Sequence, residues 1–334
     1  MPRPVLLIHG GAGDIPHSRI AGKFKGIKEA LRCAWGSLVP ASGEGQGSAL
    51  DAVEAAVRSM ELDENFNAGY GSCLNTDGQV EMEASLMEGR DLRAGCVTLL
   101  RDVMHPITVA RRLMEKRRHT FIGGEAAQEL ALATGSERLP ANALVTEGAR
   151  YTLQQFQEQL AQGKDPFFAR TELAAEQRTD PSGETVGAVA MDLDGQIAVA
   201  TSTGGITGKW PGRIGDTPIL GSGTYADNAR GGVSTTGHGE TIMRYNLAQR
   251  ILAAIEHKGM SAQAAADQEC RAMTQRLGGT GGAIVVGPAG DLGISFTSQR
   301  MAWGYIQDET IFYGIEGQAV HQEPLALGTS TVHI

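Results

Sequence analysis

The chain has 334 residues, which is enough for one large domain or two ordinary ones with a substantial core. Its formal net charge of −9 disfavours nucleic acid as a partner, because binding to a phosphate backbone rests on clustered Lys and Arg. The basic residues between 111 and 118 fall in a stretch with helical periodicity, which indicates a solvated helix face.

The four cysteines are widely spaced, with neither a CxxC pair nor a histidine at zinc-ligand spacing. We therefore expect neither a disulfide framework nor a structural metal site built on these side chains. The apolar run near the N-terminus is too short for a signal peptide, and no later run reaches the length of a membrane span. These features predict a reduced, soluble, cytoplasmic protein without a membrane partner.

The first part of the chain mixes strand-like and helical patterns. Ser48 is a suitable N-cap, and Pro106 is a suitable first residue of a helix. The expected elements, in chain order, are a strand at 5–9 that runs into a glycine loop at 9–13, a helix from 49 to about 60, strands at 79–82 and 95–100, and a helix from 106.

Residues 141–184 are rich in charge and turn formers, apart from a polar helix at 151–162, and are expected to form a surface linker. At Thr185 the pattern changes abruptly. The apolar runs 185–192 and 196–202 are joined by Leu193-Asp194-Gly195, and Asp-Gly indicates a hairpin. Downstream we expect helices at 241–257 and 261–277, strands at 283–286, 292–298 and 301–306, and an irregular end.

A charged linker that leads straight into a core strand has two interpretations. It marks either a domain boundary or a site at which the chain is processed. Because the first half is poorly arranged to close a sheet alone, we favour one interleaved domain over residues 1–334. Processing would divide this domain into an α piece, 1–184, and a β piece, 185–334.

Thr185 is the residue at which such processing would create chemistry. A threonine hydroxyl is a weak nucleophile unless a base takes its proton, and the amine of an N-terminal threonine can serve as that base. A free α-amine titrates at about 7.7 to 8.0, close to neutral pH. Taken alone, however, a threonine that opens a strand is ordinary β propensity.

Several glycine-rich motifs accompany Thr185 in a fixed order. They are Asn67-Ala-Gly-Tyr-Gly, Thr185-Val-Gly-Ala-Val-Ala, Thr201-Ser-Thr-Gly-Gly, Gly212-Arg-Ile-Gly-Asp-Thr-Pro, Tyr225-Ala-Asp-Asn and Ser234-Thr-Thr-Gly-His-Gly-Glu. In these motifs the chain resembles the plant-type L-asparaginases and isoaspartyl (β-aspartyl) peptidases, which are N-terminal-nucleophile hydrolases. The resemblance implies an α+β fold, the four-layer αββα sandwich, usually with two processed protomers paired as a dimer.

The resemblance also implies roles for individual residues. Thr185 would be the nucleophile, exposed by self-cleavage after Glu184, and Thr203 would support its amine and hydroxyl. Arg213 would bind the substrate α-carboxylate with its planar fork, and Asp216 would bind the α-ammonium group. With both α groups held, only the side-chain amide of an aspartyl unit can reach the nucleophile.

The remaining implied roles are carried by small or polar residues. Thr236 and the N–H of Gly237 would form an oxyanion hole, where one donor is typically worth about 2.7 to 4 kcal/mol. Gly239 would add a backbone contact to the substrate. Asn67 matches the family's asparagine near the nucleophile. The sequence His9-Gly10-Gly11 resembles a glycine loop that takes part in self-cleavage.

The resemblance implies no organic cofactor but does imply a structural sodium ion. The ion would be held by main-chain carbonyls of the loop 60–70, those of Met60, Glu61, Asp63, Phe66, Ala68 and Tyr70. Carbonyls leave no side-chain signature in a sequence, so this expectation comes from the resemblance alone.

The chain departs from the family at Glu184, where asparaginases commonly have Gly and glycosylasparaginases have Asp. An acidic group there could assist proton transfer or slow the attack, and we expect slow but complete cleavage. The predicted function is hydrolysis of L-asparagine and of isoaspartyl dipeptides. The alternatives are a glycosylasparaginase-like hydrolase and an uncleaved, non-catalytic binding protein. Gly204 and Asp216 favour the first function, while the preferred leaving group stays open.

Overall fold

The computed structural model describes residues 3–40, 47–164, 184–317 and 319–325. Its helices are α1 (Ile20–Leu38), preceded by a 3-10 turn (His17–Arg19), α2 (Ala49–Glu61), α3 (Pro106–Lys116), α4 (Glu125–Ala133), α5 (Glu147–Ala161), α7 (Gly239–Tyr245), α8 (Leu247–Lys258) and α9 (Ala262–Leu277). Its strands are β1 (Val5–Gly13), β2 (Met82–Glu88), β3 (Ala94–Leu100), β4 (Phe121–Gly123), β5 (Val186–Met191), β6 (Ile197–Thr203), β7 (Thr224–Asp227), β8 (Gly231–Gly237), β9 (Gly281–Val286), β10 (Leu292–Phe296), β11 (Arg300–Gln307), β12 (Thr310–Gly314) and β13 (His321–Pro324).

The strands form two sheets. The larger has nine strands in the order β13-β12-β11-β1-β5-β6-β2-β3-β4, and the smaller has the order β10-β9-β8-β7. Strand β1 pairs antiparallel with β11 on one side and with β5 on the other. The first strand of the chain thus lies between two strands from its second half.

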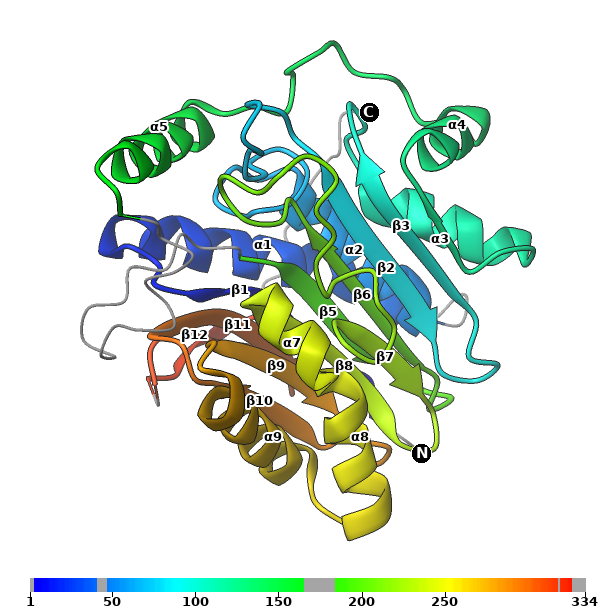
Figure 1. The fold of residues 1–334 in the computed structure, drawn as a ribbon. Coiled ribbons are helices and arrows are strands. Elements are labelled where there is room, and N and C mark those ends of the chain that lie inside the picture. The colour runs from blue at the N-terminus through cyan, green and yellow to red at the C-terminus, as the bar shows by residue number, and fades with distance from the viewer. Residues whose placement is uncertain (1–2, 41–46, 165–183, 318, 326–334) are drawn as a thin grey trace.

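Helices pack against each of the two sheets (Figure 1). Helices α1, α2 and α3 pack on one face of the nine-stranded sheet, around apolar residues such as Ile27, Val53 and Leu86. The smaller sheet packs on the other face, where Val189 and Ile284 belong to a shared apolar cluster. Helices α8 and α9 cover the outer face of the smaller sheet. The mixed α and β class expected from the sequence is confirmed.

Local signals placed several elements correctly. The Ser48 hydroxyl accepts a hydrogen bond from the Asp51 N–H at 3.2 Å and caps α2, and Pro106 begins α3. The predicted hairpin is the pair β5 and β6. Its turn closes with the Gly195 N–H on the Asp192 carbonyl at 3.0 Å, and Gly195 has a φ of 74°, which suits glycine.

Three expectations about boundaries were wrong. The strand expected at 79–82 begins only at Met82, because the Asn75 side chain accepts the N–H groups of Asp77 and Gln79 and folds this stretch into a turn. The helix expected at 241–257 is two helices, since Asn246 adopts a left-handed conformation with a φ of 59°. The glycine loop at 9–13 is instead part of β1, with a register shift between His9 and Ala12.

The polar helix expected at 151–162 within the linker is confirmed as α5, but it begins earlier, at Glu147. Thr146 caps this helix, which buries Leu153 and Phe156. Residues 165–183 of the linker lie outside the described residues. The end expected to be irregular contains β12 and β13, which extend the larger sheet through β11.

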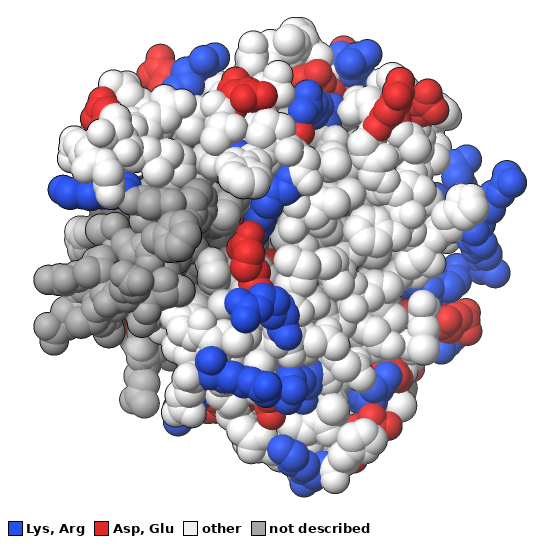
Figure 2. All heavy atoms as spheres, in the orientation of Figure 1, with Lys and Arg blue, Asp and Glu red and all other residues white. Residues whose placement is uncertain are grey.

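The surface carries charges of both signs. Figure 2 shows Lys and Arg side chains interspersed with Asp and Glu side chains on the face drawn. On α3, Arg111 contacts Asp51 at 3.0 Å and Glu115 at 2.6 Å, and Lys116 is exposed, as expected for a solvated helix face. Within the part of the chain that the structure describes, no helix is both long and apolar enough to span a membrane.

Candidate active site

Thr185 lies directly before β5, next to the end of β6. Because Val186 pairs with Ser202, Thr185 faces Thr203, the last residue of β6. Both side chains are buried, at 3% exposure each, and the Thr185 hydroxyl donates to Oγ1 of Thr203 at 3.3 Å. The two threonines expected to act together are therefore in contact.

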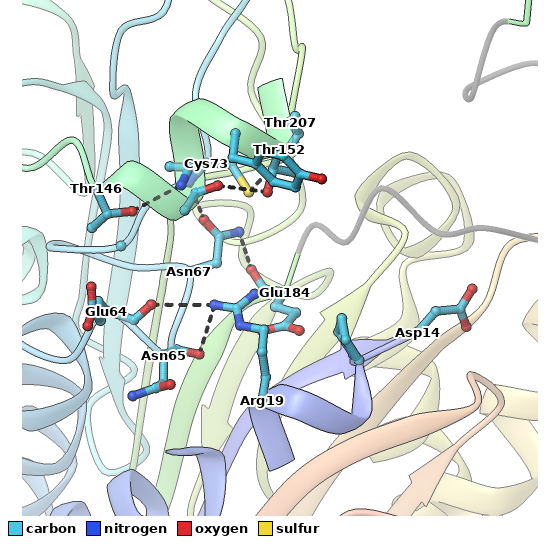
Figure 3. A pocket seen from close by; sticks show the side chains of 15 residues that line it. Asp14, Arg19, Glu64, Asn65, Asn67, Cys73, Thr146, Thr152, Glu184 and Thr207 are labelled. Carbon is cyan, nitrogen blue, oxygen red and sulfur yellow. Dashed lines mark hydrogen bonds between the residues drawn. The ribbon is translucent and has the colours of Figure 1, made fainter. Parts of the chain in front are cut away.

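The carbonyl oxygen of Glu184 accepts two hydrogen bonds beside the Thr185 hydroxyl. Asn67 Nδ2 donates to it at 2.5 Å and Thr203 Oγ1 at 3.1 Å. Asn67 is itself fixed, because its Oδ1 accepts the Cys73 N–H at 2.7 Å. Figure 3 shows the Asn67 amide between Cys73 and Glu184 in a pocket that these residues help to line. Donors thus lie where negative charge would develop if the Glu184 carbonyl were attacked.

A small second pocket lies on the Thr185 side. It brings together Thr185 and Thr203 with six other residues from the motifs, namely Gly205, Arg213, Gly215, Asp216, Gly237 and Gly239. Gly237 ends β8 with a φ of 124°, and Gly239 begins α7. A Cβ on Gly239 would lie 2.7 Å from Nη2 of Arg213 and 2.9 Å from Oδ1 of Asp216. Glycine is required there because a side chain would fill the space between the pair.

Two glutamates that the sequence analysis missed fix the position of Arg213 and of the loop that carries Asp216. Arg213 donates from Nε and Nη2 to the Glu240 carboxylate, both at 2.9 Å. The Glu83 carboxylate accepts the Gly215 N–H at 3.0 and 3.1 Å and so supports the loop that carries Asp216. Glu240 follows Gly239 within a quoted motif, whereas Glu83 lies in β2 with no local signal.

Asp216 is buried, and burial raises its pKa to about 7, against the charge of Arg213 and a hydrogen bond from Thr235 at 3.0 Å, which both lower it. Burial lowers the pKa of Arg213, but the hydrogen bonds to Glu240 and the charges of the neighbouring carboxylates outweigh this effect and raise the pKa above its ordinary value. The pocket thus holds a permanent cation beside an acid that titrates near neutrality.

Thr236 and His9 do not line the Thr185 pocket, but each links β1 to β8 through its side chain. Thr236 is fully buried, and its Oγ1 accepts the Ala12 N–H at 3.0 Å. His9 Nε2 lies 2.9 Å from Oγ of Ser234, and burial lowers the His9 pKa to about 3, so the imidazole is neutral at physiological pH.

Gly10 and Gly11 bring β1 against the residue before the nucleophile. Gly11 has a φ of 110°, and a Cβ on it would lie 2.5 Å from Cβ of Glu184. The Gly10 carbonyl accepts a hydrogen bond from Lys23 Nζ at 2.7 Å, and Lys23 also contacts the Glu184 carboxylate. Lys23 lies on the inner side of α1 and was not expected at the site.

Residues 60–70 comprise the end of α2 and the compact loop that follows it. The carbonyls of Met60, Glu61 and Asp63 accept the N–H groups of Asp63, Tyr70 and Phe66 at 3.3, 2.8 and 3.0 Å. Each of these three carbonyl oxygens thus already accepts one backbone hydrogen bond and keeps a second lone pair. Among the described residues, no group of three or more His, Cys, Asp or Glu side chains could hold a metal ion.

Sequence comparison agrees with this geometry. A family model described as asparaginase matches residues 2–315, and the chain belongs to this family of amide hydrolases. Similar proteins include a probable isoaspartyl peptidase/L-asparaginase of Drosophila pseudoobscura pseudoobscura, 93% identical over 326 residues that cover 98% of this chain and 100% of that protein. A probable isoaspartyl peptidase/L-asparaginase of Drosophila melanogaster is 83% identical over 332 residues, covering 98% and 100%. The isoaspartyl peptidase/L-asparaginase of Homo sapiens is 43% identical over 314 residues, covering 94% and 96%.

Proposed function

We propose that this chain is a threonine-dependent amidohydrolase that cleaves L-asparagine and isoaspartyl dipeptides after cutting itself between Glu184 and Thr185. The names of its relatives and the family support this substrate class. The observation that carries the proposal is one pocket that contains Thr185, Thr203, Arg213 and Asp216, while Asn67 and Thr203 both donate to the carbonyl of the preceding Glu184.

Self-cleavage begins when Thr185 Oγ1 attacks the carbonyl carbon of Glu184. The bond from that carbon to the Thr185 nitrogen breaks, and the hydroxyl proton ends on the released nitrogen, which leaves an ester. Water then opens the ester, giving a Glu184 carboxylic acid and restoring the Thr185 hydroxyl. The donors Asn67 and Thr203 lie on the oxygen that becomes negative during the first step.

The new terminal amine of Thr185 then serves as the base for the same hydroxyl during turnover. Arg213 binds the substrate α-carboxylate through Nη1, which lies over the pocket-lining Gly215 while Glu240 occupies Nε and Nη2. Asp216 binds the α-ammonium group. Thr236 and the Gly237 N–H stabilise the oxyanion, and Gly239 contributes a backbone contact.

The wider setting is proposed on the same basis. The order of helices, large sheet, small sheet and helices supports the αββα sandwich of N-terminal-nucleophile hydrolases as a single interleaved domain. We further propose a homodimer of processed protomers and a sodium ion on the carbonyls of the 60–70 loop. We also propose a reducing, cytoplasmic setting, because the four cysteines are widely spaced in the sequence and include no CxxC pair.

An intact mass spectrum of the purified protein tests the cut. We expect fragments 1–184 and 185–334, whereas Thr185→Ala stays at full mass. The cleaved protein should release ammonia from L-asparagine and aspartate from β-aspartyl-leucine. Wild-type protein that stays at full mass after long incubation would contradict the mechanism, and cleaved protein that is inert on both substrates would favour the glycosylasparaginase-like alternative.

A further inference from the structure

Lys23 is a fully buried lysine whose ammonium group contacts the side chain of the residue before the bond that the proposed function cuts. Nζ donates to the Glu184 carboxylate and, at 2.7 Å, to the Gly10 carbonyl. It also lies 4.6 Å from the centre of the Phe66 ring. A buried ammonium group is costly unless it is paired, and Glu184, itself 1% exposed, is its partner.

Glu184 is thereby held at both ends. Its carboxylate is fixed by Lys23 from α1, and its carbonyl oxygen is fixed by Asn67 and Thr203 from the opposite side. Gly11 packs against its Cβ, which leaves the side chain little freedom. Restricting both ends orients the carbonyl carbon relative to the Thr185 hydroxyl, and such orientation contributes strongly to intramolecular attack.

The ion pair of Lys23 and Glu184 also neutralises a buried negative charge near the reacting atoms. Attack on the Glu184 carbonyl places negative charge on its oxygen, and an unpaired carboxylate on the same residue would repel that charge in a buried setting. Lys23 offsets it. The other charged groups that act on Lys23 are Arg19, in the 3-10 turn before α1, and Asp63, in the loop after α2.

We propose that Lys23 is a positioning residue for self-cleavage, which adapts the site to a glutamate before the nucleophile by pairing with it. The inference rests on the proposed function, since it concerns the bond before Thr185. Lys23 contacts neither Thr185 nor the pocket of Arg213 and Asp216. Its role is therefore confined to maturation and ends when the bond is cut.

A double-mutant cycle on the full chain tests the pairing. Wild type, Lys23→Met, Glu184→Gln and the double variant are made by cell-free translation, and loss of full-length mass is followed over time. We expect each single variant to cleave at least about tenfold more slowly, because each leaves one buried charge unpaired. The double variant should return to within about threefold of wild type, because neither charge remains.

Lys28→Met is the matched control. Lys28 lies on the same helix and donates to Glu323 at 2.9 Å, away from the cut bond. Its loss should leave the cleavage rate unchanged. The fraction of Lys23→Met that does cleave should show wild-type kcat/KM on L-asparagine, whereas a general loss of structure would lower activity and cleavage together.

The outcomes separate the two proposals. Wild type that never cleaves overturns self-cleavage and the role of Lys23 with it. Wild type that cleaves at the same rate as Lys23→Met overturns the role of Lys23 alone. A folded double variant whose cleavage rate is reduced by the product of the two single-variant reductions also overturns the role of Lys23. Independent substitutions multiply their effects on a rate, whereas substitutions of two paired groups do not.

Discussion

Asp216 shows a conflict between stability and binding at a single residue. Its pKa is raised from 3.8 to about 7, so the folded state holds the proton more tightly than the unfolded chain does. Stability therefore falls as pH rises from about 4 to about 7, and the loss is complete above that range. The charged form that costs stability is the form proposed to bind the substrate ammonium group.

Asp216→Asn should accordingly raise stability at pH 8 by on the order of 1 to 4 kcal/mol, because the buried charge is removed. The gain should nearly vanish at pH 4, where wild-type Asp216 is protonated in the fold. Melting temperatures at both pH values check the sign, and kcat/KM for L-asparagine should fall at least about tenfold at pH 8. Asp194→Asn, in the β5–β6 turn, is the control and should show neither effect. An equal gain at both pH values would contradict the titration of Asp216.

At the scale of elements, the break between α7 and α8 depends on one backbone conformation. Asn246 has φ 59° and ψ 54°, and a left-handed conformation costs most residues roughly 1 to 2 kcal/mol, while asparagine and glycine tolerate it. The break matters for the site because α7 begins at Gly239 and carries Glu240.

Asn246→Ala should therefore destabilise the protein by about 1 kcal/mol, and Asn246→Gly by clearly less. Both changes remove the hydrogen bond from Ser222 at 3.3 Å, so their difference isolates the backbone term. Thermal denaturation measures it. Equal melting temperatures for the two variants would show that the side chain, and not the left-handed backbone, sets the break.

At the scale of the whole molecule, the proposed cut would separate strands that are neighbours in one sheet. Strand β1 pairs with β11 and β5, and β2 pairs with β6, so strands on both sides of residue 184 alternate in the sheet (Figure 1). The sheet and its apolar layers bind the pieces together without the connecting peptide bond.

We expect the cleaved fragments to elute together in size-exclusion chromatography and to separate only in denaturant. The uncut Thr185→Ala chain is the control and should elute at the same volume. Fragments that separate in plain buffer would show that the sheet alone does not hold the two pieces, and that the single interleaved domain is the wrong description.

Much of this arrangement was visible in the sequence where the physics is local. The Ser48 cap, the Pro106 start and the Asp-Gly turn act within a few residues, so their elements were placed correctly. The family motifs contain all the residues that line the Thr185 pocket except Ile206. The turn formed by Asn75 and the left-handed conformation of Asn246 were missed. Asparagine favours both conformations but also occurs in many segments that adopt neither, so its presence alone does not predict them.

From the sequence alone, the resemblance of several motifs in a fixed order indicated which side chains are proposed to carry the chemistry, because those motifs are short and can be matched residue by residue. Only the tertiary structure decided that Lys23 meets Glu184, that Glu83 supports the loop of Asp216, and that β1 enters between β11 and β5. These contacts join residues more than 100 positions apart, so no local pattern in the sequence predicts them. They depend on burial, which makes a polar group costly unless it has a partner.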